Sequence, residues 1–400
     1  MSLDTGDTGF MLVATALVMI MTPGLAFFYG GLVSRKNVLA VMMQSYVSMG
    51  VTTILWVTVG YSLCFSGGAG GIIGNLDLMF LKGISPSDLS GTMPTLLFVV
   101  YQMMFAVITP ALITGAFANR ITFKAYLIFL VAWQLFVYFP FVHMIWGGGM
   151  LADWGVLDFA GGIVVHALAG MAALASVLYV GSRQNEDEGA HNVPFVALGA
   201  ALLWFGWFGF NAGSELAVDG ITALAFINTQ IAAGFAAITW LLIAWHYDEK
   251  PSFVEMLIGM IAGLATITPA AGFVSPQSAM VIGVAAGVVC YFAVVLRKKK
   301  GLDDALDVWG VHGVGGCLGI IMLGVLASTE INPAGADGLI SGSSTFFMAE
   351  VGALALACAW AFIFTYGMLY AIDQITPVRV EEGDEASVDE ALHGEAAYID

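Results

Sequence analysis

Two histidines stand inside strongly apolar stretches, and their chemistry is the first feature of this chain that needs an explanation. His166 lies in LDFAGGIVVHALAG (157–170), eight residues after Asp158. His312 lies in DVWGVHGVGG (307–316), which also begins with an aspartate. Two neutral imidazoles that meet edge to edge can hold each other's tautomer through a hydrogen bond. Such a pair would offer a ring nitrogen to a small polar solute.

The surroundings of the histidines decide between a structural and a functional role. A single histidine in a soluble core is usually a structural residue that is hydrogen-bonded to a neighbour. Inside a bilayer an ionisable side chain is costly unless it faces a cavity or a partner, which favours a pore or relay function. Metal binding and intramembrane hydrolysis are alternatives, but the sequence has no His-x3-His set, no cysteine-rich set and no nucleophile motif. We therefore expect no metal, no other cofactor and no enzymatic activity.

Asp158 and several aromatic residues could act on a cation. Asp158 is either a helix N-cap, worth about 1 kcal/mol, or a buried carboxylate that shapes an outer vestibule; both roles are compatible. Phe105, Trp146 and Phe210 could be ordinary core and membrane-interface residues. Together with the hydroxyl of Ser214, they also describe a cation–π site for a small cation. Composition alone does not distinguish ordinary core and interface residues from a cation–π site.

Composition predicts that the elements carrying these residues are membrane helices. The chain has 400 residues, of which 59% are hydrophobic and 10% are charged, whereas soluble domains have roughly 25% charged residues. Apolar runs of transmembrane length recur throughout the chain. We expect an all-α polytopic membrane protein with eleven spans, near residues 9–33, 38–66, 94–118, 125–143, 158–181, 195–213, 221–246, 253–271, 277–296, 308–327 and 345–373.

The basic residues predict the orientation of these spans. With eleven spans, every Lys and Arg except Lys82 falls in an odd-numbered loop or in the C-terminal tail. Cytoplasmic loops collect Lys and Arg. We therefore expect an outside N-terminus and a cytoplasmic C-terminus.

The positions of the two histidines predict an internal repeat. Five spans separate the histidine-containing spans five and ten, and an odd number of spans per half inverts the second half. We therefore expect two inverted five-helix repeats plus one extra C-terminal helix. Glycines at 161, 162, 170, 310, 313, 315 and 316 would let these two spans pack closely and bring the imidazoles together, although they could serve packing alone.

The last residues differ sharply from the rest of the chain. Residues 374–400 hold eight acidic residues against Arg379, which is −7 of the net charge of −17. We divide the chain into a membrane domain, 1–373, and an acidic cytoplasmic tail, 374–400, that is either disordered or docked on a partner.

The quoted motifs resemble those of the ammonium transporter family (Amt/MEP/Rh), in particular its microbial Amt branch. The resemblance extends from TPGLAFFYGGLV (22–33) to HGEAAY (393–398) and includes HMIWGGGMLADWGVLDFAGGIVVH, GWFGFNAGS and DVWGVHGVGG in the family's order. It implies an ammonium transporter of the plasma membrane that forms homotrimers, with one pore in each protomer.

The resemblance also implies roles for the residues at the outer end of that pore. Phe105, Trp146 and Ser214 match the site where the family recruits ammonium. Phe105 and Phe210 match two stacked phenylalanines that close the pore. Asp158 matches an acidic residue required near the recruitment site.

Deeper in the membrane, His166 and His312 match the family's paired pore histidines, and Trp207 matches a tryptophan beside them. A narrow apolar pore imposes a large desolvation cost on any intact cation. Ammonium, unlike potassium, can lose a proton and cross as ammonia. Family-level knowledge favours net charge movement in the microbial branch.

The tail resembles the family's regulatory C-terminus, beside which PII-type signalling proteins plug the pore. It keeps the family's RV opening and HGEAAY ending, but has EASVD where many members have Gly-Leu-Asp. A solvated acidic tail is the alternative. No nucleic-acid partner is expected.

Two other functions remain open at this point. A non-conducting ammonium sensor could use the same site, but we expect no output domain after span eleven, and both histidines are present. A channel for neutral ammonia gas, as in the Rh branch, is disfavoured by Trp146, because its aromatic face favours a cation.

Overall fold

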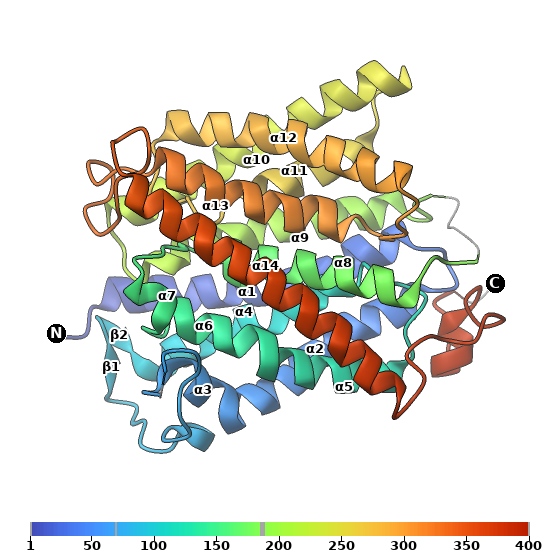
Figure 1. The fold of residues 1–400 in the computed structure, drawn as a ribbon, viewed down its shortest axis with the longest axis horizontal. Helices are drawn as coiled ribbons and strands as arrows, with labels where there is room; N and C mark the ends of the chain where they lie inside the picture. The colour runs from blue at the N-terminus through green and yellow to red at the C-terminus, as the bar shows by residue number, and fades with distance from the viewer. Residues whose placement is uncertain (1, 69, 185–188, 399–400) are drawn as a thin grey trace.

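Long helices run side by side and form a bundle, with the two ends of the chain at opposite ends of it (Figure 1). The computed structural model describes residues 2–68, 70–184 and 189–398. We call the end of the bundle that holds the N-terminus the N-terminal end, and the opposite end, which carries residues 374–398, the tail end.

The elements follow the order of the expected spans, with η marking 3-10 and π-helical turns. They are α1 Thr5–Leu32, α2 Val38–Leu55, η1 Trp56–Gly60, α3 Tyr61–Phe65, η2 Met79–Leu81, β1 Leu89–Ser90, β2 Met93–Pro94, α4 Thr95–Ile113, α5 Phe123–Trp133, η3 Gln134–Tyr138, α6 Phe139–Ile145, α7 Met150–Asp153, η4 Gly162–Ala167, α8 Leu168–Val180, α9 Val193–Ala212, η5 Gly213–Glu215, α10 Gly220–Asp248, α11 Phe253–Ile267, α12 Pro276–Lys299, η6 Trp309–Gly313, α13 Val314–Leu326, α14 Ser344–Asp373 and η7 Asp389–His393.

Ten of the helices that the structure describes are long and apolar enough to cross a membrane. The expected span at 253–271 is α11, which has 15 residues. At 1.5 Å per residue, a helix of that length reaches only about 22 Å, less than the roughly 30 Å hydrocarbon core of a bilayer. The expected mostly helical membrane fold is confirmed, while the exact count of eleven stays a prediction.

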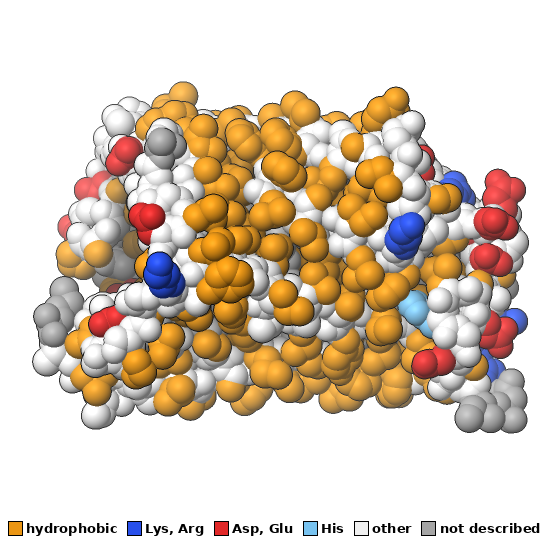
Figure 2. Space-filling view, turned by 90° about the horizontal axis from the view of Figure 1, so that it is seen from below, with side chains coloured by type: hydrophobic (Ala, Val, Ile, Leu, Met, Phe, Trp, Pro, Cys, Tyr) orange, Lys and Arg blue, Asp and Glu red, His pale blue; other side chains and the backbone are white. Residues whose placement is uncertain are grey.

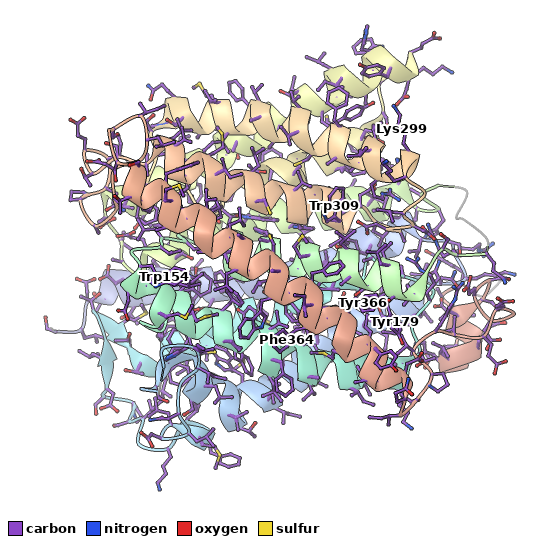
Figure 3. The ribbon with its side chains drawn as sticks, viewed as in Figure 1. Trp154, Tyr179, Lys299, Trp309, Phe364 and Tyr366 are labelled. Carbon is purple, nitrogen blue, oxygen red and sulfur yellow. The ribbon has the colours of Figure 1, made fainter. Side chains whose placement is uncertain are left out.

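The outer surface of the bundle matches a lipid environment. Figure 2 shows hydrophobic side chains across the middle of the molecule and charged side chains gathered toward its two ends. Large apolar residues such as Ile54 and Ile363 are mostly exposed on this surface. At the two ends of the spans lie aromatic residues that suit a membrane interface, such as Trp154 toward the N-terminal end and Tyr179 and Tyr366 toward the tail end (Figure 3).

Close packing of α1 against α9 brings together two of the helices that line the interior. A Cβ atom added to Gly199 would lie 2.2 Å from the backbone nitrogen of Phe28, and one added to Gly206 would lie 2.5 Å from the carbonyl oxygen of Leu17. Because these distances exclude any side chain, glycine is required for the two backbones to approach.

The tail packs on its own membrane domain in the residues that the structure describes. The Asp389 carboxylate accepts hydrogen bonds from the backbone N–H groups of Leu39 and Ala40, at 3.0 and 2.8 Å, and so caps the start of α2. Arg379 donates to the carbonyl oxygen of Val180 and forms an ion pair with Glu385. The alternative of a disordered tail is therefore wrong for these residues, because these intramolecular contacts order them, while docking of a partner on the tail stays a prediction.

Candidate functional site

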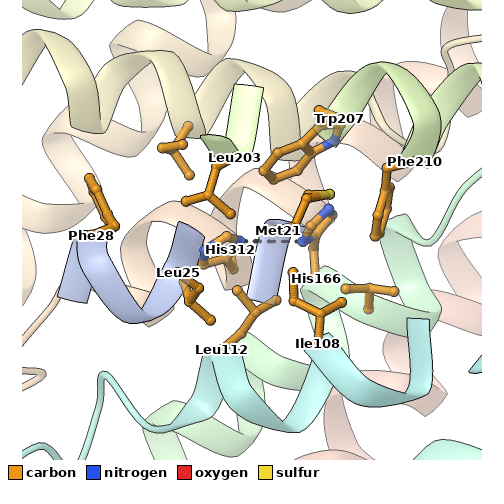
Figure 4. A pocket seen from close by; sticks show the side chains of 12 residues that line it. Met21, Leu25, Phe28, Ile108, Leu112, His166, Leu203, Trp207, Phe210 and His312 are labelled. Carbon is orange, nitrogen blue, oxygen red and sulfur yellow. Dashed lines mark hydrogen bonds between the residues drawn. The ribbon is translucent and has the colours of Figure 1, made fainter. Parts of the chain in front are cut away.

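A narrow cavity lies at the centre of the bundle (Figure 4). Its volume is about 10 Å³, close to the minimum that holds one water molecule. The lining comes from six elements of the fold, α1, α4, η4, α9, α11 and η6: Met21, Leu25, Phe28, Ile108, Leu112, Val165, His166, Leu203, Trp207, Phe210, Ile261 and His312. Apart from the two imidazoles and the indole of Trp207, these side chains are apolar, so an ion in this cavity would lose its hydration without compensation.

His166 and His312 meet inside this cavity, as their flanking glycines predicted. Their Nδ1 atoms are 3.3 Å apart and their ring planes are inclined by 20°. One Nδ1 must donate and the other must accept, so the two neutral rings hold complementary tautomers. Nε2 of His166 is buried and has no hydrogen-bond partner among the described residues. This nitrogen is therefore available to a small polar solute.

Glycines permit this contact between the two histidine-containing spans. A Cβ atom added to Gly170 would lie 2.0 Å from Cα of Gly313, and one added to Gly316 would lie 2.7 Å from Cβ of His166. Any larger residue at these positions would push the spans apart and separate the imidazoles. These glycines therefore allow the two spans to pack closely, and the same close packing places the two histidines side by side.

Each histidine lies in a π-helical turn, η4 for His166 and η6 for His312. Such turns are rare and often occur at functional sites. The η4 turn follows Gly161, whose φ of +116° favours glycine, and the N–H of His166 donates to the carbonyl oxygen of Gly161 at 3.0 Å. The sequence indicated a helix here but not this wider turn.

Asp158 caps the η4 turn at the N-terminal end of the bundle. Its carboxylate accepts four backbone hydrogen bonds, from Gly161, Gly162, Ile163 and Val164, at 2.6 to 3.1 Å. The carboxylate therefore fixes the start of the turn that carries His166. Asp158 is buried and does not line the outer cavity described below.

Asp304, rather than the aspartate that opens DVWGVHGVGG, occupies the corresponding position before His312. Asp304 precedes His312 by eight residues, the same separation as between Asp158 and His166. Its Oδ2 accepts the N–H of Trp309, the first residue of η6, at 2.7 Å. Asp307, which the sequence analysis paired with His312, instead forms an ion pair with Arg297. The identical spacing of eight could have identified Asp304 from the sequence.

A stack of aromatic rings connects the histidines with the N-terminal end. The ring centroids of Phe105 and Phe210 are 4.3 Å apart and their planes differ by 33°. Phe210 lies 6.1 Å from His166 by ring centroids, in a nearly parallel orientation. Trp146 meets Phe105 edge to face at 5.9 Å. Phe105 and Phe210 thus stand between the central cavity and the space outside it.

A second cavity, of about 290 Å³, opens at the N-terminal end beyond the two phenylalanines. Phe105, Trp146 and Ser214 all line it, as does Gln102. The indole of Trp146 donates to the carbonyl oxygen of Asp158 at 2.8 Å, which orients its face. Oε1 of Gln102 has no hydrogen-bond partner among the described residues. Gln102 is a candidate site residue that was not recognised from the sequence, although a glutamine within an apolar run is a signal for one.

Trp207 lies beside the histidines, as its motif led us to expect. Its ring stacks on that of His166 with centroids 5.5 Å apart, and its indole donates to the hydroxyl of Thr268 at 2.9 Å. The hydroxyl of Thr268 was not recognised from the sequence. Within the described residues, no group of three or more His, Cys, Asp and Glu side chains could hold a metal ion.

Several charged residues lie close together at the tail end of the bundle, near η6. Asp303 forms ion pairs with Arg120 and Arg183, at 3.4 and 2.8 Å. Burial opposes ionisation of Asp303, but hydrogen bonds from Arg183 and the charge of Arg120 lower its pKa. For Asp304, burial and then the charge of Asp307 raise the pKa to about 6. Arginine charge is therefore concentrated at this end, and the N-terminal end has no counterpart in the ion pairs described.

Comparisons with known proteins agree with this geometry. The family model described as Ammonium Transporter Family matches residues 9–398. An ammonium transporter of Bacillus subtilis is 45% identical over 403 residues, which is 100% of each chain. The crystal structure of Mep2 from Saccharomyces cerevisiae has a TM-score of 0.89 at 34% identity and covers 95% of this chain and 91% of its own. A solved structure titled Sensor Amt Protein has a TM-score of 0.88 at 26% identity, with 96% of each chain covered.

Proposed function

The chain belongs to the ammonium transporter family and is a multi-pass membrane protein, and on this premise we propose that it conducts ammonium through the central cavity that His166, His312 and Phe210 line. In this proposal the N-terminal end faces outside and the tail end faces the cytoplasm. The observation that carries the proposal is the continuous series of outer cavity, stacked phenylalanines and histidine pair.

Recruitment is the first step of the proposed mechanism. The ring faces of Phe105 and Trp146 attract a small cation through cation–π interaction, and the Ser214 hydroxyl accepts a hydrogen bond from it. The cavity of about 290 Å³ has room for a hydrated cation. The hydroxyl of Tyr101 forms a hydrogen bond with that of Ser214, with the two oxygens 3.3 Å apart.

Deprotonation at the gate gives selectivity. Ammonium and potassium have similar sizes, so an open hydrated pore would pass both. Beyond Phe105 and Phe210, the narrow cavity of about 10 Å³ has an almost entirely apolar lining without a counter-charge, so a cation loses most of its hydration there without compensation. Ammonium can transfer its proton to the histidine pair, which relays it, and cross as ammonia, whereas potassium has no neutral form.

The histidine pair then receives the neutral species. Ammonia can donate a hydrogen bond to a ring nitrogen that has no protein partner, such as Nε2 of His166. The shared Nδ1 contact with His312 holds the tautomers that keep one acceptor and one donor along the cavity. A proton relayed by the same pair would make transport electrogenic, and we propose net charge transfer.

Assembly and regulation are further parts of the proposal. We infer a homotrimer with one pore per protomer, as in the family. We also infer control by a PII-type protein at the tail end, where the tail packs beside a cavity of about 550 Å³ lined by Arg183, Asp303 and Asp307.

Solid-supported membrane electrophysiology on proteoliposomes tests this proposal. An ammonium concentration jump is expected to give a transient current, and potassium at the same concentration is expected to give none. Parallel measurement of ammonia flux with an internal pH dye distinguishes the alternatives. Flux without current would indicate a gas channel, whereas neither current nor flux would indicate a sensor. The sensor stays a second candidate because of the likeness to the structure titled Sensor Amt Protein.

A further inference from the structure

Glu350 is a buried carboxyl group that the proposed mechanism does not use. It lies near the start of α14 and its side chain is 0% exposed. Oε1 accepts the backbone N–H of Leu157 at 2.6 Å, and Oε2 has no hydrogen-bond partner among the described residues. A carboxyl group with an unpaired oxygen in such surroundings costs stability, so its presence needs an explanation.

The contacts around Glu350 connect it to the entrance of the pore. Leu157 directly precedes Asp158, whose carboxylate caps the η4 turn that carries His166. Two other hydrogen bonds hold the same short segment, from the Trp146 indole to the carbonyl of Asp158 and from the N–H of Phe159 to the carbonyl of Pro269. Glu350 provides the third attachment, and it comes from α14.

The balance of hydrogen bonds places a proton on Glu350. Asp158 is the neighbouring carboxyl group, because Leu157, which donates to Glu350, directly precedes it. The Asp158 carboxylate accepts four backbone N–H groups, whereas Glu350 accepts one. No described ion pair joins Glu350 to a basic residue. Two nearby carboxylates in an apolar interior do not both stay ionised, so the group with fewer donors takes the proton.

We propose that Glu350 is a neutral carboxylic acid and a positioning residue of the pore entrance. From α14 it holds the backbone at Leu157, which in turn sets the Asp158 carboxylate and the η4 turn. It does not contact ammonium. This inference rests on the proposed function for its effect on transport, but the protonation state and the positioning of the backbone can be measured without transport.

Infrared spectroscopy of the purified full-length protein in lipid nanodiscs at neutral pH tests the protonation state. Glu350→Gln, which keeps the shape and the neutral charge, is expected to remove one carbonyl band of a protonated carboxylic acid. Glu330→Gln, at an exposed acid, is the matched control and is expected to leave that region of the spectrum unchanged. If Glu350→Gln removes no such band, the group is ionised and the proposal is overturned.

Hydrogen–deuterium exchange tests the positioning role. Glu350→Leu is expected to speed amide exchange in residues 157–166 by about tenfold, equivalent to about 1.4 kcal/mol of local opening, while Glu350→Gln keeps the wild-type rate. Should Glu350→Leu fail to insert, Glu350→Asp replaces it, because the shorter acid cannot reach Leu157. Unchanged exchange in the variant that folds would refute the positioning role.

Transport supplies the third readout. Glu350→Leu is expected to lower the ammonium current about tenfold, and Glu350→Gln to restore it to within about twofold of the wild type. A Gln variant as impaired as the Leu variant would show that the acid itself is required. If the wild type has neither current nor flux, the proposed function fails, while the infrared and exchange results still decide the state and role of Glu350.

Discussion

The two histidine-containing turns have the same plan but opposite electrostatic surroundings. In each, an aspartate eight residues before the histidine caps a π-helical turn, Asp158 for η4 and Asp304 for η6. Asp158 satisfies its oxygens with four backbone N–H groups, and no described ion pair includes it. Asp304 lies among Asp307, Arg297 and the ion pairs of Asp303. The two turns thus share a backbone plan, but among the described residues only the turn at the tail end lies beside arginine ion pairs.

This comparison explains how one plan can serve two ends of a pore. In the proposed function, the Asp158 carboxylate at the N-terminal end, which has no described arginine partner, favours the approach of a cation to the aromatic faces of Trp146 and Phe105. At the tail end, arginines neutralise the carboxylates. Four substitutions test how far the parallel extends, and their expected effects decrease in the order given.

The largest effect is expected from removing one histidine of the pair. His166→Ala deletes the ring that stacks on Phe210 and pairs with His312. We expect the ammonium current to fall about a hundredfold, about 3 kcal/mol, or potassium to begin to compete. Currents in proteoliposomes measure both outcomes. His246→Ala, at an exposed position in α10, is the control, and a His166→Ala current equal to wild type would end the pore role of the pair.

The two capping aspartates are expected to differ in their effect on transport. Asp158→Asn leaves a single acceptor oxygen for four N–H donors and removes the charge, so we expect about a tenfold loss of current. Asp304→Asn is expected to cost only about twofold, because Oδ1 of Asp304 has no hydrogen-bond partner. Equal losses in the two variants would show that the electrostatic difference between the ends has no role in transport.

Stability at different pH values should also separate residues at the tail end. Burial and Asp307 raise the pKa of Asp304 to about 6, so the folded protein holds a proton that the unfolded chain releases. Stability from this group therefore increases as the pH falls through about 6, by at most a few kcal/mol.

Thermal unfolding in detergent measures this pH effect. Between about pH 7 and pH 5, wild-type Tm should rise relative to that of Asp304→Asn. Asp303 is the matched contrast, because its pKa is lowered and its stabilisation is lost only as the pH falls below its ordinary range. A pH-independent difference between wild type and Asp304→Asn would mean that Asp304 does not change its protonation state between about pH 7 and pH 5, which would contradict the prediction.

The smallest effect on transport is expected for Asp389, the aspartate cap that lies outside the proposed pore. Asp389 caps α2 from the tail, and Asp389→Ala should lower the free energy of unfolding by about 1 kcal/mol without changing the ammonium current. The exposed Glu390→Ala is the control for charge. A large loss of current in Asp389→Ala alone would show that the tail acts on transport through α2.

The sequence by itself determined the helical membrane fold, because lipid makes apolar length informative, and it singled out the two intramembrane histidines, because polar residues are costly there. The roles of the aromatic residues and Ser214 stay predictions from the family resemblance. The contact between His166 and His312 could be predicted, because the glycines beside them let the two spans approach closely. Larger side chains at those positions would prevent this approach. The length of the short span at α11 and the intramolecular docking of the tail could not be obtained in this way. The docking of the tail depends on contacts between segments far apart in the chain.

Tertiary structure alone decided the properties that depend on distance and hydrogen-bond direction. The π-helical turns and the Nδ1 contact between the histidines have no signature in residue types, and for Asp158 the sequence predicted an N-cap but not its four donors. Asp304 had a signature in its separation of eight residues from His312. It was not recognised because Asp307 is nearer to His312 in the sequence. Glu350 is 192 residues from Asp158 in the sequence, and only the packing of α14 brings its carboxyl group to the backbone of the pore entrance.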